Sequence, residues 1–287
     1  MKKIIIHFGY HKTGTSALQE TFSEYREELR SKGLYYPQSI LGFPAPQELS
    51  WSLISQENRK KWMNVPKPYQ EIYHDLLSNF ESSGCHTLIV SSEDLTYLEK
   101  EVGGLNLLHE MFNGYDIQLI CYVRNQVDFL LSLYGHGLRV GAINCTFEEH
   151  VRNNVNLKIG EFDKRIALWE LAFGQKVKVC KYEPKGFFNK NICDDFFNSL
   201  NININIAFPH YKSNKSLHPW CRDLMKNVKD IEFLDKEEVV DTIIDLSNRL
   251  PKVSARECYM NEDFYLYLKD YYTNSSTELA SKYNIIF

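Results

Sequence analysis

The feature that most constrains the fold is an apolar run near the N-terminus that leads directly into a glycine-containing loop. Ile4, Ile5 and Ile6 are followed by His7 and Phe8, then by the loop GYHKTGTS over residues 9–16, and residues 17–30 have helical spacing. A strand, a glycine loop and a helix in this order aim free backbone N–H groups and a helix N-terminus at an anion. The segment therefore predicts an anion-binding loop.

The lysine of this loop does not stand where a nucleoside triphosphate site has it. The usual triphosphate loop reads GxxxxGK[ST], with the lysine directly after the second glycine. Here Lys12 precedes Gly14, and no basic residue follows that glycine. This order keeps the cradle and moves the ammonium to the mouth of the loop, where it can meet a bridging or leaving oxygen. The alternative is a plain glycine turn into a helix capped by Thr13 or Thr15.

Hydrophobic patterning along the rest of the chain predicts an α/β fold with a central parallel sheet flanked by helices. Four β-type runs alternate with stretches of helical spacing, a pattern that favours a parallel sheet covered on both faces. The predicted strands cover residues 3–8, 87–91, 118–123 and 176–180. The predicted helices cover residues 15–32, 68–83, 104–113, 126–139, 161–173, 190–200, 217–230, 236–249 and 261–283.

We interpret residues 1–287 as a single domain whose C-terminal part, residues 217–287, is helical. Residues 34–68 carry five prolines and several aromatic residues, too many breakers for a long helix. They are predicted to form an insertion packed over one edge of the sheet.

Composition excludes several classes of protein. Hydrophobic residues make up 44% and charged residues 24% of the 287 positions, which argues against disorder. The net charge of −4 lacks the basic footprint of a general nucleic-acid binder, so an anionic ligand needs a local cluster of donors. Apolar runs are far shorter than the roughly 20 residues of a membrane-spanning helix. Seven cysteines without a CxxC pair favour a reducing compartment, the cytoplasm.

A second motif strengthens the interpretation of the first. The segment GYHKTGTSALQ resembles the 5′-phosphosulfate loop of sulfotransferases that use 3′-phosphoadenosine 5′-phosphosulfate (PAPS). In that family an Arg closes a later strand and a Ser follows on the next helix, and here Arg124 and Ser132 stand eight residues apart in that place. A guanidinium fork and a hydroxyl on one helix face suit a phosphate. Gln126 replaces a frequent proline of the family, and pairing of Arg124 with Asp128 is the plainer alternative.

Weaker similarity follows in the same order along most of the chain and looks like bacterial carbohydrate sulfotransferases. The segments concerned are Ser91-Ser92-Glu93, Leu138-Arg139-Val140-Gly141, Phe147-Glu148, Lys181-Tyr182-Glu183 and Asn214-Lys215-Ser216-Leu217. The resemblance implies a P-loop-like sulfotransferase fold and transfer of a sulfuryl group from PAPS to a carbohydrate hydroxyl, on a glycan or a glycolipid. The product nucleotide would be 3′-phosphoadenosine 5′-phosphate (PAP).

The resemblance also implies roles for individual residues. The N–H groups of Thr13, Gly14, Thr15 and Ser16 would bind the 5′-phosphate, with the Thr15 and Ser16 hydroxyls as further donors. Lys12 would stabilise the charge that builds on the bridging oxygen. Arg124 and Ser132 would hold the 3′-phosphate, and Tyr182 would lie near the adenine or simply at the edge of the core.

The residue that takes the proton of the acceptor hydroxyl is left open by the sequence. Glu93 is the first candidate, because it follows a strand whose carboxyl end should face the ligand crevice. It can also serve as an acceptor contact or as an acid at a helix start. His136 is the second candidate and His11 the third. No metal site is predicted, because His7 and His11 lack carboxylate or cysteine partners in the sequence.

The acceptor site is the least defined part of the prediction. Tyr35, Tyr36 and Trp51 of the insertion and Arg139 and Arg152 further on are candidates for an aromatic and basic cleft, although aromatics in such an insertion commonly serve packing. Two other functions share the N-terminal pattern. One is a P-loop kinase, which would need carboxylates such as Asp94 for Mg²⁺, and the other is a nucleotide-binding protein without turnover.

Overall fold

The computed structural model describes residues 1–209, 217–227, 236–251 and 253–287. The chain divides into two compact units. The sheet unit comprises Met1–Val123 and Asp163–Tyr211, and the helical unit comprises Arg124–Phe162 and Lys212–Phe287. Each unit is described separately below. No helix among the described residues is both long and apolar enough to cross a bilayer.

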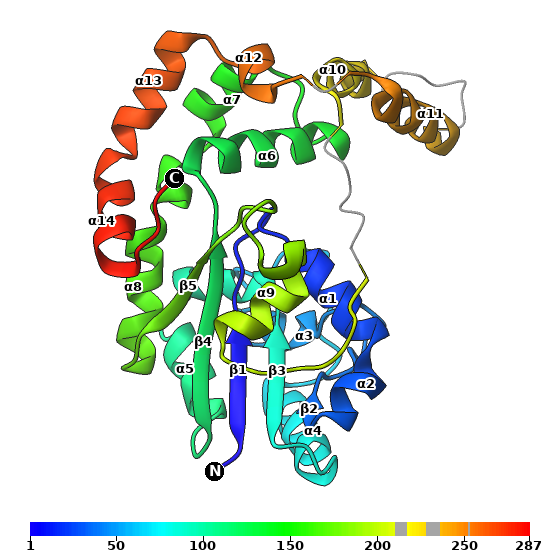
Figure 1. Ribbon diagram of the computed structural model, residues 1–287, viewed down its shortest axis with the longest axis vertical. Helices are drawn as coiled ribbons and strands as arrows, with labels where there is room; N and C mark the ends of the chain where they lie inside the picture. Colours follow the sequence, from blue (N-terminus) through cyan, green and yellow to red (C-terminus); the bar gives the residue numbers. More distant parts are fainter. Residues whose placement is uncertain (210–216, 228–235, 252) are drawn as a thin grey trace. The chain divides into compact units, whose positions relative to one another are not determined.

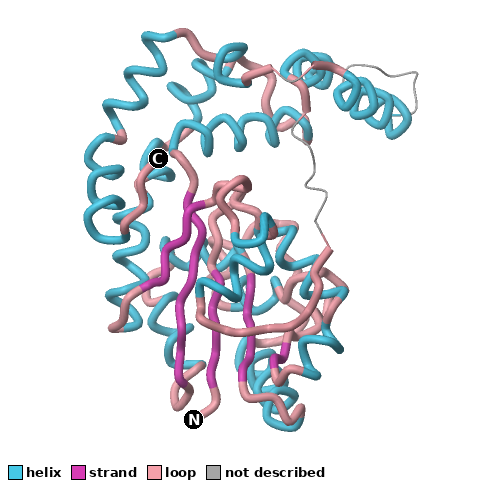
Figure 2. The backbone as a smooth tube through the Cα atoms, in the orientation of Figure 1, coloured by secondary structure: helices cyan, strands magenta, loops and turns pink. Residues whose placement is uncertain are grey.

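The sheet unit is built on five parallel strands in the order β2-β3-β1-β4-β5 (Figures 1 and 2). The strands are β1 Lys3–His7, β2 Leu34–Tyr35, β3 Thr87–Ser91, β4 Asp116–Val123 and β5 Val177–Lys181. The predicted α/β class with a parallel sheet is therefore confirmed, and so are all four predicted strands to within two residues at either end. The short edge strand β2 was not predicted.

The helices of the sheet unit include two 3₁₀ segments, labelled η. They are α1 Thr15–Glu24, α2 Arg26–Ser31, α3 Gln47–Ser52, α4 Tyr69–Ser82, η1 Glu93–Lys100, α5 Gly104–Met111, α8 Phe162–Phe173, η3 Phe188–Lys190 and α9 Ile192–Ser199. The first residue of α8, Phe162, is assigned to the helical unit.

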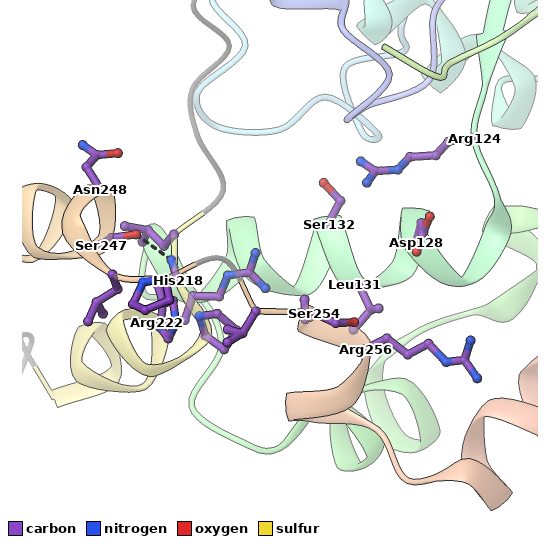
Figure 3. A pocket seen from close by; sticks show the side chains of 16 residues that line it. Arg124, Asp128, Leu131, Ser132, His218, Arg222, Ser247, Asn248, Ser254 and Arg256 are labelled. Carbon is purple, nitrogen blue, oxygen red and sulfur yellow. Dashed lines mark hydrogen bonds between the residues drawn. The ribbon is translucent and has the colours of Figure 1, made fainter. Parts of the chain in front are cut away.

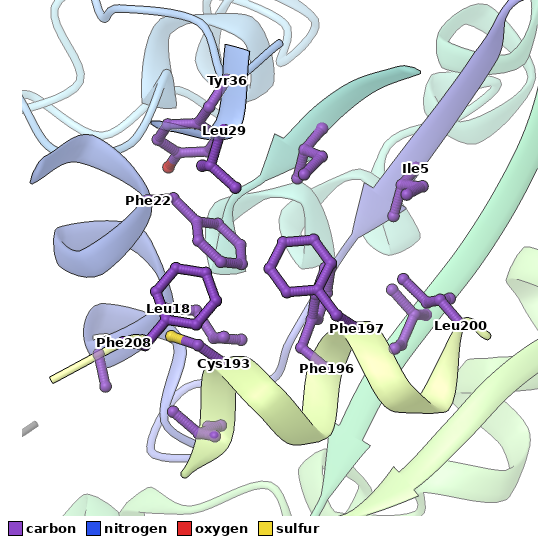
Figure 4. Close-up of a cluster of buried hydrophobic side chains, with 14 of the residues drawn as sticks. Ile5, Leu18, Phe22, Leu29, Tyr36, Cys193, Phe196, Phe197, Leu200 and Phe208 are labelled. Atoms are coloured by element: carbon purple, nitrogen blue, oxygen red, sulfur yellow. The ribbon is translucent and has the colours of Figure 1, made fainter. Parts of the chain in front are cut away.

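The core of the sheet unit follows the two-residue period of the strands. Ile5 faces a cluster of aromatic and aliphatic side chains from α1, α2 and α9 (Figure 4). Ile4 and Ile6 point to the opposite face and are also fully buried. Burial of both faces explains why this strand is a continuous apolar run rather than an alternating one.

The insertion at residues 34–68 was predicted to pack over one edge of the sheet, but part of it forms that edge. Its first two residues are β2, which pairs with β3 and thus forms the edge itself. A single short helix, α3, follows after Pro46 and packs against η1. The prolines prevent a long helix, as expected, but leave room for one of six residues.

The helical unit is organised around α6, Gln126–Arg139. The other helices are α7 Phe147–Asn154, η2 Leu157–Gly160, α10 Pro219–Asn227, α11 Lys236–Arg249, α12 Ala255–Tyr259, α13 Glu262–Tyr271 and α14 Thr273–Tyr283. Helices α7, α10, α12 and α13 all pack against α6, and α11 packs on α10. The predicted helical C-terminal region is confirmed for the described residues.

Candidate functional site

The strand order defines a topological switch point in the sheet unit. The chain leaves β1 toward β2 on one side of the sheet and leaves β4 toward β5 on the other, so the connections diverge between β1 and β4. Open α/β sheets bind ligands outside the carboxyl ends of the strands at such a switch point. The loop after β1, residues 8–14, lies at this point.

The backbone of this loop has the alternating conformation of an anion nest. Lys12 has a φ of 66° and Gly14 a φ of 85°, whereas Thr13 between them is not in the left-handed region. Alternating left- and right-handed residues turn successive N–H groups toward one concave side. A left-handed lysine is uncommon and costs on the order of 1–2 kcal/mol, so the loop holds Lys12 in place against a local preference.

The start of α1 contradicts the plainer interpretation of the loop. Gly14 is the N-cap residue, and no side chain caps the helix. The Thr13 hydroxyl donates to the Tyr10 carbonyl at 2.5 Å, and the Thr15 hydroxyl donates to the same carbonyl at 3.5 Å. Both hydroxyls therefore brace the loop, and the first N–H groups of α1 have no carbonyl acceptor within the helix. Thr15 thus offers its N–H rather than its hydroxyl to a ligand, while Ser16 is exposed.

Tyr182 packs against the loop at Gly14. A Cβ atom at Gly14 would lie 2.6 Å from Cε2 of Tyr182 and 2.4 Å from Cδ1 of Ile192. The Tyr182 ring is also edge-to-face with Phe187, their centroids 5.6 Å apart. Only glycine fits at position 14, both for its φ and for this close approach.

Glu93 follows β3, as predicted, and is half-buried at the start of η1. Its Oε2 accepts a hydrogen bond of 2.7 Å from Nε2 of Gln19, on the first turns of α1. Because Gln19 also donates to the Ser91 carbonyl at 3.4 Å, the amide links α1, β3 and the carboxylate. The structure therefore fixes the orientation of Glu93 from the helix that follows the anion loop.

Asp94, the next residue, is hydrogen-bonded within the protein, whereas a kinase would need its carboxylate for Mg²⁺. It is 4% exposed, and its Oδ2 accepts a hydrogen bond of 2.6 Å from Nε1 of Trp51. His11 Nε2 lies 3.9 Å from the other carboxylate oxygen. Burial raises the pKa of Asp94, and the charge of Glu93 raises it further, against the Trp51 hydrogen bond and His11.

The aromatic residues of the insertion pack against other side chains, which was the alternative to a role in an acceptor cleft. Tyr36 and Trp51 are each 2% exposed, and Trp51 is committed to Asp94. Tyr35 is partly exposed and stacks with Phe80 at 6.1 Å between centroids. Their faces serve the core rather than an open sugar platform.

In the helical unit, Arg124 and Ser132 line one pocket of about 510 Å³ (Figure 3). Arg124 is the residue directly after β4, Asn125 caps α6 through its side chain, and Ser132 lies on the second turn of the helix. In Figure 3 the Arg124 guanidinium extends toward the Ser132 side chain. Arg124 and Ser132, which the sequence placed on one face, therefore line the same pocket. His136 lies on the same helix but is exposed and does not line the pocket.

Gln126, at the position where the sulfotransferases that the sequence resembles often have proline, occupies the first helical position of α6. Proline is favoured there because its missing N–H would be unpaired anyway. In this chain the buried Gln126 side chain instead accepts a hydrogen bond of 3.4 Å from Ser276 on α14. The departure from the family pattern thus ties α6 to the C-terminal helix.

A buried arginine of this pocket was not predicted from the sequence. Arg222 on α10 is 4% exposed, lines the same pocket, and has Nε and Nη1 atoms without hydrogen-bond partners among the described residues. No local motif signals it, because its neighbour is Gly135 on a distant helix. The segment 214–217 resembles sulfotransferases, but its residues 214–216 lie outside the described residues.

Comparison with known proteins supports the fold. No protein-family model matches the sequence, and no curated protein matches it. Among solved structures, a sulfotransferase from Alicyclobacillus acidocaldarius is similar to the chain, with a TM-score of 0.56 and 15% sequence identity. The match covers 99% of this chain and 96% of that one. The chain thus has the fold of a sulfotransferase.

Proposed function

We propose that the chain is a sulfotransferase that moves a sulfuryl group from PAPS to a hydroxyl of a carbohydrate acceptor. The observation that carries the proposal is the loop after β1, which lies at the switch point of the sheet. In this loop Lys12 and Gly14 are left-handed and Thr13 between them is not. The fold match supports it, and so does the joint lining of one pocket by Arg124 and Ser132. The carbohydrate class of the acceptor rests on the sequence resemblance.

The residues present fit the donor nucleotide. The loop offers N–H groups and the positive end of α1 to a 5′-phosphate, and Tyr182 beside Gly14 offers a ring for an adenine. Arg124 and Ser132 offer a guanidinium and a hydroxyl to a 3′-phosphate. When bound, the donor supplies an activated S–O bond to phosphate.

In the proposed reaction the acceptor oxygen forms a bond to sulfur while the bond from sulfur to the phosphate oxygen breaks. The acceptor proton passes to Glu93, whose carboxylate is oriented by Gln19. Lys12 stabilises the negative charge that develops on the departing phosphate oxygen. Positioned charges of this kind supply most of the catalysis in the related transfer of phosphoryl groups.

The kinase alternative is disfavoured by Asp94. Its carboxylate is buried against Trp51 rather than presented to a hydrated magnesium ion, which usually retains several waters. A binding protein without turnover would use the same loop and pocket, so only a transfer assay separates it from an enzyme.

We place the reaction in a reducing compartment, the cytoplasm, because all seven cysteines are free thiols.

The first test compares the stabilisation of the protein by PAP, 5′-AMP and ATP, with and without Mg²⁺. PAP should stabilise the protein without the metal, and loss of its 3′-phosphate should weaken binding by about 2–4 kcal/mol, as expected for charge-assisted contacts. Equal stabilisation by PAP and 5′-AMP would remove Arg124 and Ser132 from the nucleotide site.

The second test replaces Lys12 with Ala. Transfer from PAPS to a validated carbohydrate acceptor should fall by about 10²–10³ in kcat, because an electrostatic donor leaves a preorganised site. The protein should remain folded because Lys12 is exposed. Alanine would take the same left-handed backbone conformation with a smaller side chain. Near wild-type transfer by the variant would refute the role of the loop lysine.

A further inference from the structure

Arg222 is buried in a place that a glycine of another helix makes available. Helix α10 packs against α6, and Arg222 is 4% exposed between them. A Cβ atom at Gly135 would lie 2.8 Å from Cζ of Arg222, so the guanidinium rests directly on the backbone of α6. Any larger residue at position 135 would displace it.

The buried guanidinium is satisfied only in part by the protein. Its Nε and Nη1 atoms have no hydrogen-bond partner among the described residues, whereas Tyr259, whose ring centroid lies 5.7 Å from Cζ, forms a hydrogen bond with the guanidinium. A buried donor without a partner costs free energy, and more so when it carries a charge. A ligand that accepts hydrogen bonds from these two donors would offset that cost.

The other charged residues of the pocket also favour an anion. Arg124 and Arg222 line it together with a third arginine, Arg256, whereas Asp128 is the one carboxylate among the lining residues. Arg256 is already committed, since it pairs with Glu262 at 3.3 Å and lies over a tyrosine ring. Arg222 is therefore a buried cation of the pocket whose Nε and Nη1 donors have no acceptor among the described residues.

Arg222 of α10 packs against Gly135 of α6, one turn from Ser132 on the same helix. Residues 132 and 135 are three apart, so they share one face of the helix and are separated by about 4.5 Å along its axis. Both Ser132 and Arg222 line the pocket, and Figure 3 shows them approaching it from α6 and α10. One tetrahedral group can contact a hydroxyl and a guanidinium at this spacing.

We propose that Arg222 binds a tetrahedral oxyanion, a phosphate or sulfate monoester, beside the hydroxyl of Ser132 in this pocket. The identity of that anion as the 3′-phosphate of the nucleotide rests on the proposed function. A phosphate or sulfate substituent on the acceptor is the second possible source of the same chemistry. In either case the helices after residue 217 supply a ligand contact rather than only support.

The test uses the full chain and the variants Arg222→Gln and Arg222→Lys, with Arg249→Gln as a control on an exposed arginine of α11. Affinity for PAP and 5′-AMP is measured by calorimetry. Arg222→Gln should weaken PAP by about 10–100-fold and leave 5′-AMP within about twofold, as expected for a lost charge-assisted contact. Arg222→Lys should lie between, and Arg249→Gln should match the wild type.

A further variant keeps the charge and moves it. Gly135→Ala adds a methyl group at the guanidinium while improving the helix propensity of α6, so the protein should fold. It should also weaken PAP by about 10-fold without changing 5′-AMP. This arm keeps the proposal testable if Arg222→Gln does not fold.

The outcomes separate this inference from the proposed function. If the variants bind PAP like the wild type, and the KM for the acceptor is also unchanged, the Arg222 site is refuted while a preference for PAP over 5′-AMP still supports the sulfotransferase. If the KM for the acceptor rises alone, the anion belongs to the acceptor. If the wild type binds PAP and 5′-AMP equally, the nucleotide assignment fails, and stabilisation by inorganic sulfate that Arg222→Gln abolishes would still support the anion site.

Discussion

The close approach at Gly14 leads to a prediction whose size can be worked out from the structure. Gly14→Ala forces alanine to a φ of 85°, which costs about 1–2 kcal/mol for a residue with a Cβ atom. The new methyl group would also lie 2.4 Å from Ile192 and 2.6 Å from the Tyr182 ring, about 1 Å closer than ordinary contact. Relief of this overpacking should cost a further 1–3 kcal/mol or so.

Gly103→Ala is a matched control for the backbone part of this cost. Gly103 is the N-cap of α5, just as Gly14 is the N-cap of α1, with a φ of 75° and a ψ of 0° against 85° and 9°. A Cβ atom at Gly103 would meet nothing within 4 Å. The control should therefore lose only the 1–2 kcal/mol or so of the left-handed conformation.

Urea unfolding of both variants measures the two costs, and nucleotide binding measures their effect on the loop. Gly14→Ala should bind PAP and 5′-AMP more weakly by the same factor, since both ligands carry the 5′-phosphate. Gly103→Ala should bind both like the wild type. Equal destabilisation by the two substitutions would show that Tyr182 and Ile192 do not pack against the loop, and the argument for an adenine contact at Tyr182 would fall with it.

Two further predictions concern the acidic residues after β3. Glu93→Gln keeps the shape of the side chain but cannot take a proton, so kcat should fall by about 10²–10⁴ at saturating PAPS with nucleotide affinity unchanged; His136→Ala should be mild, and the reverse result would move the base to His136. Asp94→Asn should become more stable than the wild type as pH rises from 4 to 7 in urea unfolding. A carboxyl whose folded pKa is raised contributes stability that is lost as pH rises through that pKa, whereas asparagine keeps the acceptor for Trp51 and carries no charge to bury; a pH-independent difference would contradict this.

The strands were predictable because burial on both faces leaves a direct record in the sequence. Ile4, Ile5 and Ile6 carry no polar alternation, and each is fully buried. Strand β2 was missed because two residues, Leu34 and Tyr35, are too few to form a pattern. Its place at the edge depends on pairing with β3, which no local signal encodes.

Two missed helices did carry a signal. Helix α7 begins with a complete capping box between Thr146 and Glu149, and α12 begins at Ser254, whose side chain accepts from the N–H of Glu257. Both match the pattern of a serine or threonine followed three residues later by a glutamate. Their short apolar faces concealed them, but their caps would have shown where they start.

The candidate site was predictable only where its residues act through the local backbone. The loop at Lys12 and Gly14 is visible because glycine spacing after a strand has a fixed geometric meaning. The partners of Glu93 and Asp94 were not visible, because Gln19 and Trp51 reach them from other parts of the chain. Arg222 is the extreme case, since its importance depends on a glycine 87 positions earlier in the sequence.

The division between backbone and side-chain donors also has a consequence for specificity. In the proposed function the N–H groups around Gly14 bind the 5′-phosphate that PAP and 5′-AMP share, so the loop cannot distinguish the two nucleotides, however tightly it binds. Discrimination must come from groups that contact the 3′-phosphate, which in the proposed function are Arg124, Ser132 and Arg222. A site built to pair with that phosphate rejects the nucleotide that lacks it, because the buried Arg222 donors are then left unsatisfied. The free-energy cost of burying Arg222 without a partner is thus the physical origin of the selectivity that we expect.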